Sequence, residues 1–328
     1  MTDRRSETVV RALRSNLAGG PAQLLTLIAV FVAGTGAIPG FSEPSSVRAM
    51  LVIASFLGIA ALGQTLVVLV GGIDLSLPAM IGAGNVITAH LAGSGQPSGV
   101  IFCAVVAVGL LVGTINGLIA SVWKVPPLVV TLATGSVVGG AILIWTNASL
   151  SGRAPDWLIP FTSAASSAGP VPVAPVVVLW IVLGLGGEFL LRRTHRGRQI
   201  YMLGANREAA RLMLVSERTT TTLCFAISAV LGGLTGLLLT GFTGAGLYTV
   251  GDPYLFLTIA SVVVGGTSLL GGRGGMVRSI LGALTLIALT TILVGESLSA
   301  GAQQAVLGAV IVAVTALYGR ERRVGDRV

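Results

Sequence analysis

The residues that could carry out chemistry are few, and their spacing supports no enzyme site. The chain has one lysine, Lys124 in WKVPP, so the phosphate-binding loop G-x-x-x-x-G-K-[ST] is absent. His90 and His195 lie far apart, and no carboxylate or cysteine stands at metal-ligand spacing from either. The glycine-rich run Gly265–Gly275 (GGTSLLGGRGG) also lacks a lysine, and a helix end with a tight turn accounts for it without a ligand. We therefore expect no catalytic residue, metal or cofactor in this chain.

Asp74 is the carboxylate whose surroundings are most unusual, because it lies in GQTLVVLVGGIDLSLP, residues 63–78. Gly71–Gly72 should end or break a helix, since glycine lowers helix stability. Asp74 or Ser76 can cap the next helix, and Pro78 suits its first turn. One interpretation is an ordinary turn between helices. The other is a discontinuous helix within a membrane, whose freed backbone groups are covered by protein or line a wet cavity, with Asp74 within or beside a translocation route.

The composition is that of a polytopic membrane protein. Hydrophobic residues make up 53% of the 328 residues and charged residues 10%, with a mean hydropathy of +0.92, whereas soluble domains carry about 25% charged residues. The 46 glycines fit the same class, and Cys103 and Cys224 lie in apolar runs, which suggests neither a disulfide nor a metal site. The net charge of +8 could indicate nucleic acid, but aromatic interleaving is absent and the arginines flank apolar runs, so no nucleic-acid partner is expected.

The apolar runs predict ten membrane spans within a transmembrane domain, 22–318, between cytoplasmic tails 1–21 and 319–328. The predicted spans are 22–39, 49–70, 77–93, 99–122, 126–147, 173–191, 220–242, 253–272, 276–295 and 301–318. With both termini in the cytoplasm, eighteen basic residues fall inside and only Arg48 and Arg153 outside, as the positive-inside rule requires. The longest outside connection, 148–172, is rich in Ser, Ala and Pro and should be an exposed loop.

The segment Arg192–Arg218, here called the arginine segment, is the long polar stretch between apolar runs and holds seven of the twenty Lys and Arg residues. Within it, Asn206 can cap a helix that has Glu208 in its first turn. Ala209, Leu212 and Met213 then share one face, while Arg207 and Arg211 share another. The pattern alone is compatible with a helix on the inner leaflet or one that docks on a partner protein.

Polar and small residues within the spans suggest how the helices pack. Glycines four residues apart at 109, 113 and 117, and at 135 and 139, let helix backbones approach closely. Glu188 and Arg192 have the spacing of an ion pair on one helix. Most of the polar residues should hydrogen-bond to neighbouring helices, and a pore for a neutral polar solute needs some of them to face a central gap. These residues are Gln64, Asn85, Asn116, Thr131, Thr134, Ser136, Ser228 and Thr267.

Four motifs together resemble the membrane subunits, or permeases, of ribose-type ABC importers for monosaccharides and related small solutes. GQTLVVLVGGIDLS at 63–76 is similar to that family's GGIDLS signature, and NGLIASVWKVPPLVVTL at 116–132 to its second motif. GRQIYMLGANREAARLMLV at 197–215 resembles its cytoplasmic loop, and GGTSLLGGRGG at 265–275 matches a fourth motif. The resemblance covers about residues 50–318.

The resemblance implies a ten-helix permease with a type II ABC importer-like fold in the bacterial inner membrane. It implies a second permease copy, two cytoplasmic ATPase subunits that bind ATP and Mg²⁺, and an external solute-binding protein. The cytoplasmic coupling loop would be 192–219, with Asn206, Glu208, Ala209, Arg211 and Leu212 as the residues that contact the ATPase. The candidates for the translocation pathway are Gly71, Gly72, Asp74, Ser76, Asn116 and Thr131.

Two other functions stay open. One is an allied ABC permease for branched-chain amino acids or nucleosides. The other is an ion-coupled secondary carrier that works alone, a class that usually places ionisable residues at mid-membrane, where Asp74 is the one clear candidate. The chain also departs from the family pattern at Leu77–Pro78, Ala133, Leu214, Leu255 and Arg278. These departures bear on the solute and on whether the permease pairs with itself or with a paralogue.

Overall fold

The computed structural model describes residues 20–147 and 152–319. In these ranges the regular structure is helical apart from one isolated bridge between Ala168 and Val171, which confirms the all-α prediction. Most of the two predicted tails, with their eight arginines, lies outside the described residues. The helices are α2 (Gly20–Ala37), α3 (Pro44–Leu69), α4 (Leu77–Gly93), α5 (Ser98–Val122), α6 (Pro127–Trp145), α7 (Leu158–Thr162), α8 (Pro175–Arg193), α9 (His195–Ala205), α10 (Arg207–Leu212), α11 (Glu217–Thr243), η1 (Tyr248–Gly251), α12 (Tyr254–Val264), α13 (Met276–Gly295) and α14 (Ala300–Gly319).

The predicted spans coincide with helices, but not all of these helices are long enough to cross a bilayer. Each predicted span overlaps one of α2 to α6, α8 and α11 to α14. In the described part of the chain, six helices are long and apolar enough to cross a membrane: α3, α5, α6, α8, α11 and α13. By contrast, α4 has 17 residues and α12 has 11, where a straight crossing needs roughly 20. The chain is therefore a helical multi-pass protein, and a total of ten crossings stays a prediction.

The predicted span 253–272 was too long, because α12 ends at Val264. Its last turn closes when the Gly266 N–H donates to the Val263 carbonyl at 2.8 Å and the Thr267 N–H to the Val262 carbonyl at 3.0 Å. Gly266 has a φ of +83°, the left-handed conformation that ends many helices. The apolar residues that follow belong to a loop, 265–275, that joins α12 to α13.

The prediction of an exposed loop over 148–172 was also wrong for part of the segment. Its described residues include α7, and the Leu158 and Thr162 side chains are fully buried. A Cβ atom on Gly241 would come within 2.6 Å of the Leu158 side chain, so α7 packs against the end of α11. This segment therefore closes one end of the bundle.

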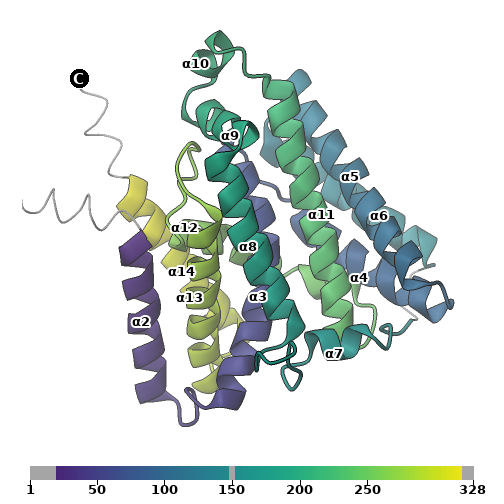
Figure 1. Ribbon diagram of the computed structural model, residues 1–328, viewed down its shortest axis with the longest axis vertical. Helices are drawn as coiled ribbons and strands as arrows, with labels where there is room; N and C mark the ends of the chain where they lie inside the picture. Colours follow the sequence, from purple (N-terminus) through teal and green to yellow (C-terminus); the bar gives the residue numbers. More distant parts are fainter. Residues whose placement is uncertain (1–19, 148–151, 320–328) are drawn as a thin grey trace, which may run out of the picture.

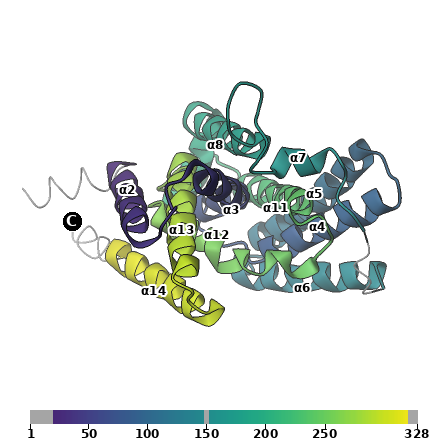
Figure 2. The same ribbon diagram turned by 90° about the horizontal axis from the view of Figure 1, so that it is seen from below.

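The bundle is arranged around α3, α4 and α11, the helices that bury most of their surface (Figures 1 and 2). On one side lie α2, α13 and α14, and on the other α5 and α6, with α8 along the flank (Figure 2). A helix that is apolar all round and buried belongs to the core of a protein, and α3 is buried almost without interruption from Val52 to Leu69. The outer helices expose large apolar side chains such as Val137, Ile144 and Val182, as lipid-facing surfaces do.

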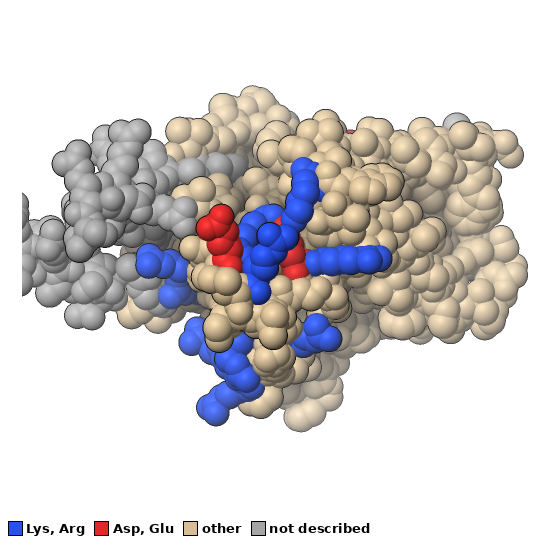
Figure 3. Space-filling model, turned by 90° about the horizontal axis from the view of Figure 1, so that it is seen from above, with Lys and Arg blue, Asp and Glu red and all other residues tan. Residues whose placement is uncertain are grey.

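Basic residues of the described chain gather at one end of the bundle, where α9 and α10 lie (Figure 3). Lys124 and Arg207 both pair with Glu217 there. At the opposite end Arg48 lies near the start of α3, and Arg153 shares a pocket with His90. The structure thus separates the basic residues of its described ranges into the two groups that the sequence predicted.

The glycines of α5 form a close contact with α11, which confirms the packing role inferred from their spacing. A Cβ atom on Gly109 would lie 2.8 Å from the Val230 Cα atom, and one on Gly117 would lie 2.4 Å from the Thr222 Cα atom. Gly113 is the most enclosed, since its Cβ would lie 2.4 Å from the Phe225 carbonyl oxygen and 2.5 Å from the Ala226 Cα atom. The two backbones therefore touch at three positions over about two turns of helix, as small residues allow in a membrane.

Replacement of Gly113 by Ala should lower the stability of the protein by about 1 to 3 kcal/mol, because the α5 and α11 backbones must separate to admit the methyl group. The measurement is the thermal unfolding temperature of the purified protein in detergent. Gly140→Ala is the matched control, since no atom lies within 4 Å of its Cβ position. Equal unfolding temperatures for Gly113→Ala and the wild type would contradict this packing role.

Candidate functional site

The candidate site is the turn Val70–Ser76, at which α3 ends and the chain reverses into α4. The Gly71 N–H donates to the Val68 carbonyl and the Gly72 N–H to the Val67 carbonyl, both at 2.9 Å. These two bonds satisfy carbonyls that the end of α3 would otherwise leave free. Gly71 has a φ of +79°, which only glycine adopts without strain. The prediction that the two glycines end a helix is confirmed.

The Asp74 carboxylate is the centre of the turn and is 2% exposed. One oxygen accepts hydrogen bonds from the Ser76 N–H at 3.0 Å and the Ser76 hydroxyl at 2.5 Å. The other accepts from the Ser228 hydroxyl of α11 at 2.8 Å. The Gln64 side-chain amide, oriented to satisfy both groups, donates to the Asp74 carbonyl at 3.2 Å and accepts from its N–H at 3.3 Å. A buried carboxylate requires such partners, because its desolvation is otherwise very costly.

The hydrogen bonds continue from the turn into α5 and α6. The Asn116 side-chain amide donates to the Ser76 hydroxyl at 2.9 Å and accepts from the Thr134 hydroxyl at 2.6 Å. The Thr131 hydroxyl accepts from the Leu75 N–H at 3.0 Å. Ser76, Asn116 and Thr131 are fully buried. The structure therefore brings together all the residues predicted for the translocation pathway, and in this conformation the polar side chains among them are closed to solvent.

The buried side of the turn packs against inner parts of α11 and α5. Ser228 stands eleven residues into α11, which begins at Glu217, and this places it roughly 16 Å from the start of that helix. Asn116 likewise lies six residues before the end of α5 at Val122. α3, with 26 residues, is itself long enough to cross a membrane before this turn, so both interpretations of the sequence, an ordinary turn and a discontinuous helix, stay predictions.

The predicted capping role was wrong in detail. Ser76 precedes α4, but its side chain makes no bond to the first N–H groups of that helix, and Asp74 bonds to Ser76 instead. Pro78 does lie in the first turn. Ser228 and Gln64 were recognised as polar residues within spans, yet no sequence signal linked them to Asp74, because Ser228 is 154 positions away.

The end of α3 also contacts α9 and the loop 265–275. The Leu69 carbonyl accepts from the Gly272 N–H at 2.9 Å. A Cβ atom on Gly204 would lie 1.8 Å from that carbonyl oxygen and 2.6 Å from the Gly272 nitrogen. Three backbones therefore meet at Leu69, Gly204 and Gly272, here called the glycine junction. This is a packing role for the glycine-rich run, which is also the helix end and tight turn expected from its sequence.

The predicted coupling helix is α10, which is shorter than its amphipathic pattern and stands at the end of the molecule (Figure 1). Asn206 caps it as predicted, since its side chain accepts from the Glu208 N–H at 2.9 Å and the Ala209 N–H at 3.0 Å. The predicted contact residues Glu208, Ala209, Arg211 and Leu212 are all exposed. The preceding helix α9, which the sequence did not distinguish, begins at a cap made by Thr194.

Three consecutive apolar residues at the end of α10 are exposed to solvent. Leu212 is 84% exposed, Met213 69% and Leu214 91%. Leu214 has a φ of +57°, so a leucine occupies the left-handed position that closes α10, where glycine is strongly preferred. The Val215 N–H donates to the Ala210 carbonyl at 3.0 Å and completes the same helix ending as at Gly71. An exposed and strained leucine contributes little to the fold, which makes it a candidate for contact with another molecule.

Ion pairs connect α10 to two other parts of the bundle. Glu217, the first residue of α11, accepts from Arg207 at 2.5 Å through one oxygen and from Lys124 at 2.6 Å through the other. Lys124 lies in the turn between α5 and α6. Exposed ion pairs contribute little to stability. We therefore infer that these contacts hold α10 in its position relative to the spans.

The fold and the site together define a class: a multi-pass helical membrane permease with a buried polar turn in its core and an exposed helix at one end. A model of the family described as branched-chain amino acid transport system / permease component matches residues 46–315. The chain therefore belongs to this family, and it is a multi-pass protein of the inner membrane.

Named relatives confirm the resemblance that the four motifs indicated. The chain is 33% identical over 272 residues to the inner membrane ABC transporter permease protein YjfF of Escherichia coli, covering 79% of this chain and 80% of the relative. It is 31% identical over 270 residues to the ribose import permease protein RbsC of Escherichia coli, with coverages of 80% and 81%. It is 30% identical over 297 residues to the autoinducer 2 import system permease protein LsrC of Klebsiella pneumoniae, with coverages of 90% and 85%.

Replacement of Leu214 by Gly should stabilise α10 by about 1 kcal/mol, because glycine removes the strain of the left-handed conformation and the exposed side chain loses no burial. Hydrogen exchange of the amides in 207–215 should slow about fivefold. Met213→Gly is the control, since Met213 is also exposed but has a φ of −84°. Faster exchange in Leu214→Gly than in the wild type would show that Leu214 stabilises the helix end.

Proposed function

We propose that this chain is the membrane-spanning subunit of an ATP-driven ABC importer and forms the pathway for a monosaccharide or similar small polar solute. The observation that carries the proposal is the turn Val70–Ser76, on which all four sequence motifs converge: one forms it, one reaches it through Asn116 and Thr131, and two meet at the glycine junction. A buried network of hydroxyl, amide and carboxylate groups offers the hydrogen-bonding chemistry that a polyhydroxylated solute needs once the turn opens.

ATP would be hydrolysed on partner subunits, which also supply the Mg²⁺ site, and the exposed residues of α10 would contact them. Leu212, Met213 and Leu214 suit an apolar groove, with Glu208 and Arg211 beside them for charge pairing. A second permease copy, homologous or identical, and an external solute-binding protein complete the proposed assembly in the lipid membrane. The arginine-rich end of the bundle would then face the cytoplasm, as would both termini.

The contacts around the turn suggest how movement of α10 could reach it. One route runs through α9 to the glycine junction at the end of α3. The other runs from Arg207 through Glu217 to Lys124 and so to α5 and α6, which carry Asn116 and Thr131. Closure of the ATPase dimer would push α10, and both routes would transmit the displacement to the turn. The pathway would open on one face as it closed on the other.

The class of solute is a separate question from the class of transporter. The descriptions of related proteins support two different answers. The relatives named for ribose and autoinducer 2 support a small polar solute. The description of the family supports branched-chain amino acids as the alternative. Uptake of labelled ribose and labelled leucine into proteoliposomes that contain the assembled importer and its binding protein would distinguish them. Uptake of either solute by the purified chain alone would instead indicate an ion-coupled carrier.

Reversal of charge on α10, by Glu208→Lys or Arg211→Glu, should reduce recovery of the ATPase subunit with the permease by about tenfold or more, because both side chains would meet like charge across the interface. The permease should still fold, since both residues are exposed. The measurement is co-purification from the membrane followed by uptake. Arg196→Glu on α9 is the control for the change in net charge. Unchanged recovery in both α10 variants would remove α10 as the coupling helix.

Replacement of Asp74 by Asn should reduce uptake by about tenfold or more, because the amide NH₂ group cannot accept the hydrogen bonds that one carboxyl oxygen now accepts, while the shape stays nearly the same. Ser228→Ala, which removes one hydrogen bond but keeps the carboxylate, should have a smaller effect. Initial uptake rates in the reconstituted importer measure both, with thermal unfolding as the check on folding. Uptake at the wild-type rate in Asp74→Asn would leave the carboxylate with a role in the turn's structure alone.

A further inference from the structure

A second pocket lies at the arginine-rich end of the bundle and has no part in the proposed pathway. It is an open pocket with a volume of about 730 Å³, and it is lined by the end of α8, by α9, by the loop 265–275 and by the first turn of α13. Arg192, Arg198, Arg273 and Arg278 line it, together with Tyr201. Four guanidinium groups around one cavity are unusual in a chain with so few charges. What the pocket could hold depends on how much of their positive charge is neutralised by nearby carboxylates.

One carboxylate, Glu188, lies close to these arginines and is already occupied. It forms the predicted ion pair with Arg192 on α8, and this prediction is confirmed. Its other oxygen accepts from the Met276 N–H at 2.6 Å and the Val277 N–H at 3.4 Å, which caps the start of α13. Glu188 is therefore engaged by three donors and offsets one arginine of the four. The pocket keeps a positive charge that the described residues around it do not neutralise.

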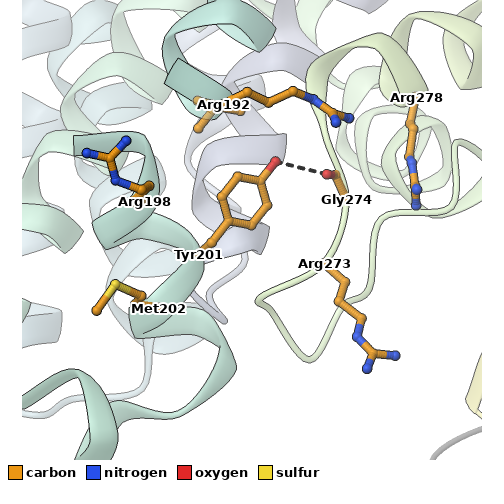
Figure 4. A pocket seen from close by; sticks show the side chains of 8 residues that line it. Arg192, Arg198, Tyr201, Met202, Arg273, Gly274 and Arg278 are labelled. Atoms are coloured by element: carbon orange, nitrogen blue, oxygen red, sulfur yellow. Dashed lines mark hydrogen bonds between the residues drawn. The ribbon is translucent and has the colours of Figure 1, made fainter. Parts of the chain in front are cut away.

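The arginines are placed on different sides of the opening (Figure 4). Arg192 and Arg278 extend toward the space beside Gly274, and Arg273 lies at another side of the same loop (Figure 4). Arg278 donates to the Gly266 carbonyl at 3.2 Å, which fixes its side chain. The Arg273 side chain makes no hydrogen bond or ion pair with any residue in the described ranges. Its five N–H donors are free for a ligand.

Tyr201 lines the pocket between α9 and the loop 265–275. Its hydroxyl donates to the Gly274 carbonyl at 2.9 Å. Burial, followed by the charge of Glu188, raises the pKa of the Tyr201 hydroxyl above its ordinary value, and Arg192 and Arg278 lower it less. The tyrosine therefore stays neutral at physiological pH and adds no negative charge. The pocket is suited to an anion with several oxygens, and phosphate matches the fork geometry of arginine best.

The pocket stands where two helices long enough to cross a membrane, α8 and α13, have their ends. Arg192 is in the last turn of α8, and Arg278 is in the first turn of α13. On α8 the exposed apolar residues Val182, Leu185 and Phe189 follow one face at spacings of three and four and lead directly to Arg192. A lipid chain could lie along this face while its head group enters the pocket, and basic pockets between helices at the inner leaflet favour anionic lipids.

We propose that this pocket binds the phosphate group of an anionic phospholipid, whose acyl chains lie along Val182, Leu185 and Phe189 of α8. A soluble phosphate compound shares the recognised group but makes no use of the apolar face. The site is independent of the transported solute, because none of its residues belongs to the turn Val70–Ser76. The bound lipid would connect α8, α9 and α13 through one anion.

Native mass spectrometry of the full-length protein in detergent, with equal amounts of phosphatidylglycerol and phosphatidylethanolamine, tests the proposal. The wild type should retain one phosphatidylglycerol per chain. Arg273→Ala should retain it about tenfold less well, because a charged hydrogen bond to phosphate is lost. The double variant Arg273→Ala/Arg278→Gln should lose more, because two of the four guanidinium groups are then absent. Arg196→Ala, which removes an equal charge outside the pocket, should retain the lipid as the wild type does.

Three results would overturn the proposal. The first is equal retention of the two lipids by the wild type. The second is full retention of phosphatidylglycerol by the double variant. The third is displacement of the lipid by millimolar inorganic phosphate, which would assign the pocket to a soluble phosphate. Arg273→Ala keeps the test valid if the double variant fails to fold, because the Arg273 side chain has no hydrogen-bond or ion-pair partner in the described part of the chain.

Discussion

The structure depends on one requirement: α3 has to end among packed apolar helices without leaving backbone groups unpaired. A free N–H or carbonyl buried there would cost several kcal/mol. Hydrogen bonds from three elements meet this requirement. The Gly72 N–H donates to the Val67 carbonyl of α3 itself, and the Gly272 N–H of a distant loop donates to the Leu69 carbonyl. The Leu75 N–H donates to the Thr131 hydroxyl of α6. Asp74 holds the turn closed through Ser76 and Ser228. The helices that carry these partners are fixed in place around it.

The outline of the site could be predicted from sequence, because its signals are local. Gly71–Gly72, the cap at Asn206 and the pair Glu188–Arg192 each depend on residues within four positions of one another, and the structure contains all three. Hydropathy located the helices for the same reason. It overran at α12, since Leu269 and Leu270 extend the apolar run past the point where Gly265 and Gly266 have already ended the helix.

The remainder of the site depends on contacts that no local pattern encodes. Asp74 and Ser228 are 154 positions apart, and Lys124 and Glu217 are 93 apart. Glu188 was expected to pair with Arg192, yet its second role, at the start of α13, requires knowledge of which helix lies beside α8. The motifs identified the four segments correctly, but only the packed helices show that all four meet at the turn or at the glycine junction beside it.

The glycine contact between α5 and α11 has a consequence for motion. Helices separated by side chains can slide when those side chains change rotamer, whereas two backbones in direct contact have no such layer to rearrange. Gly109, Gly113 and Gly117 therefore make α5 and α11 a single stiff lever. In any conformational cycle of this protein we expect α5 and α11 to move together. Bending is then confined to the segments that join these two helices to the rest of the chain.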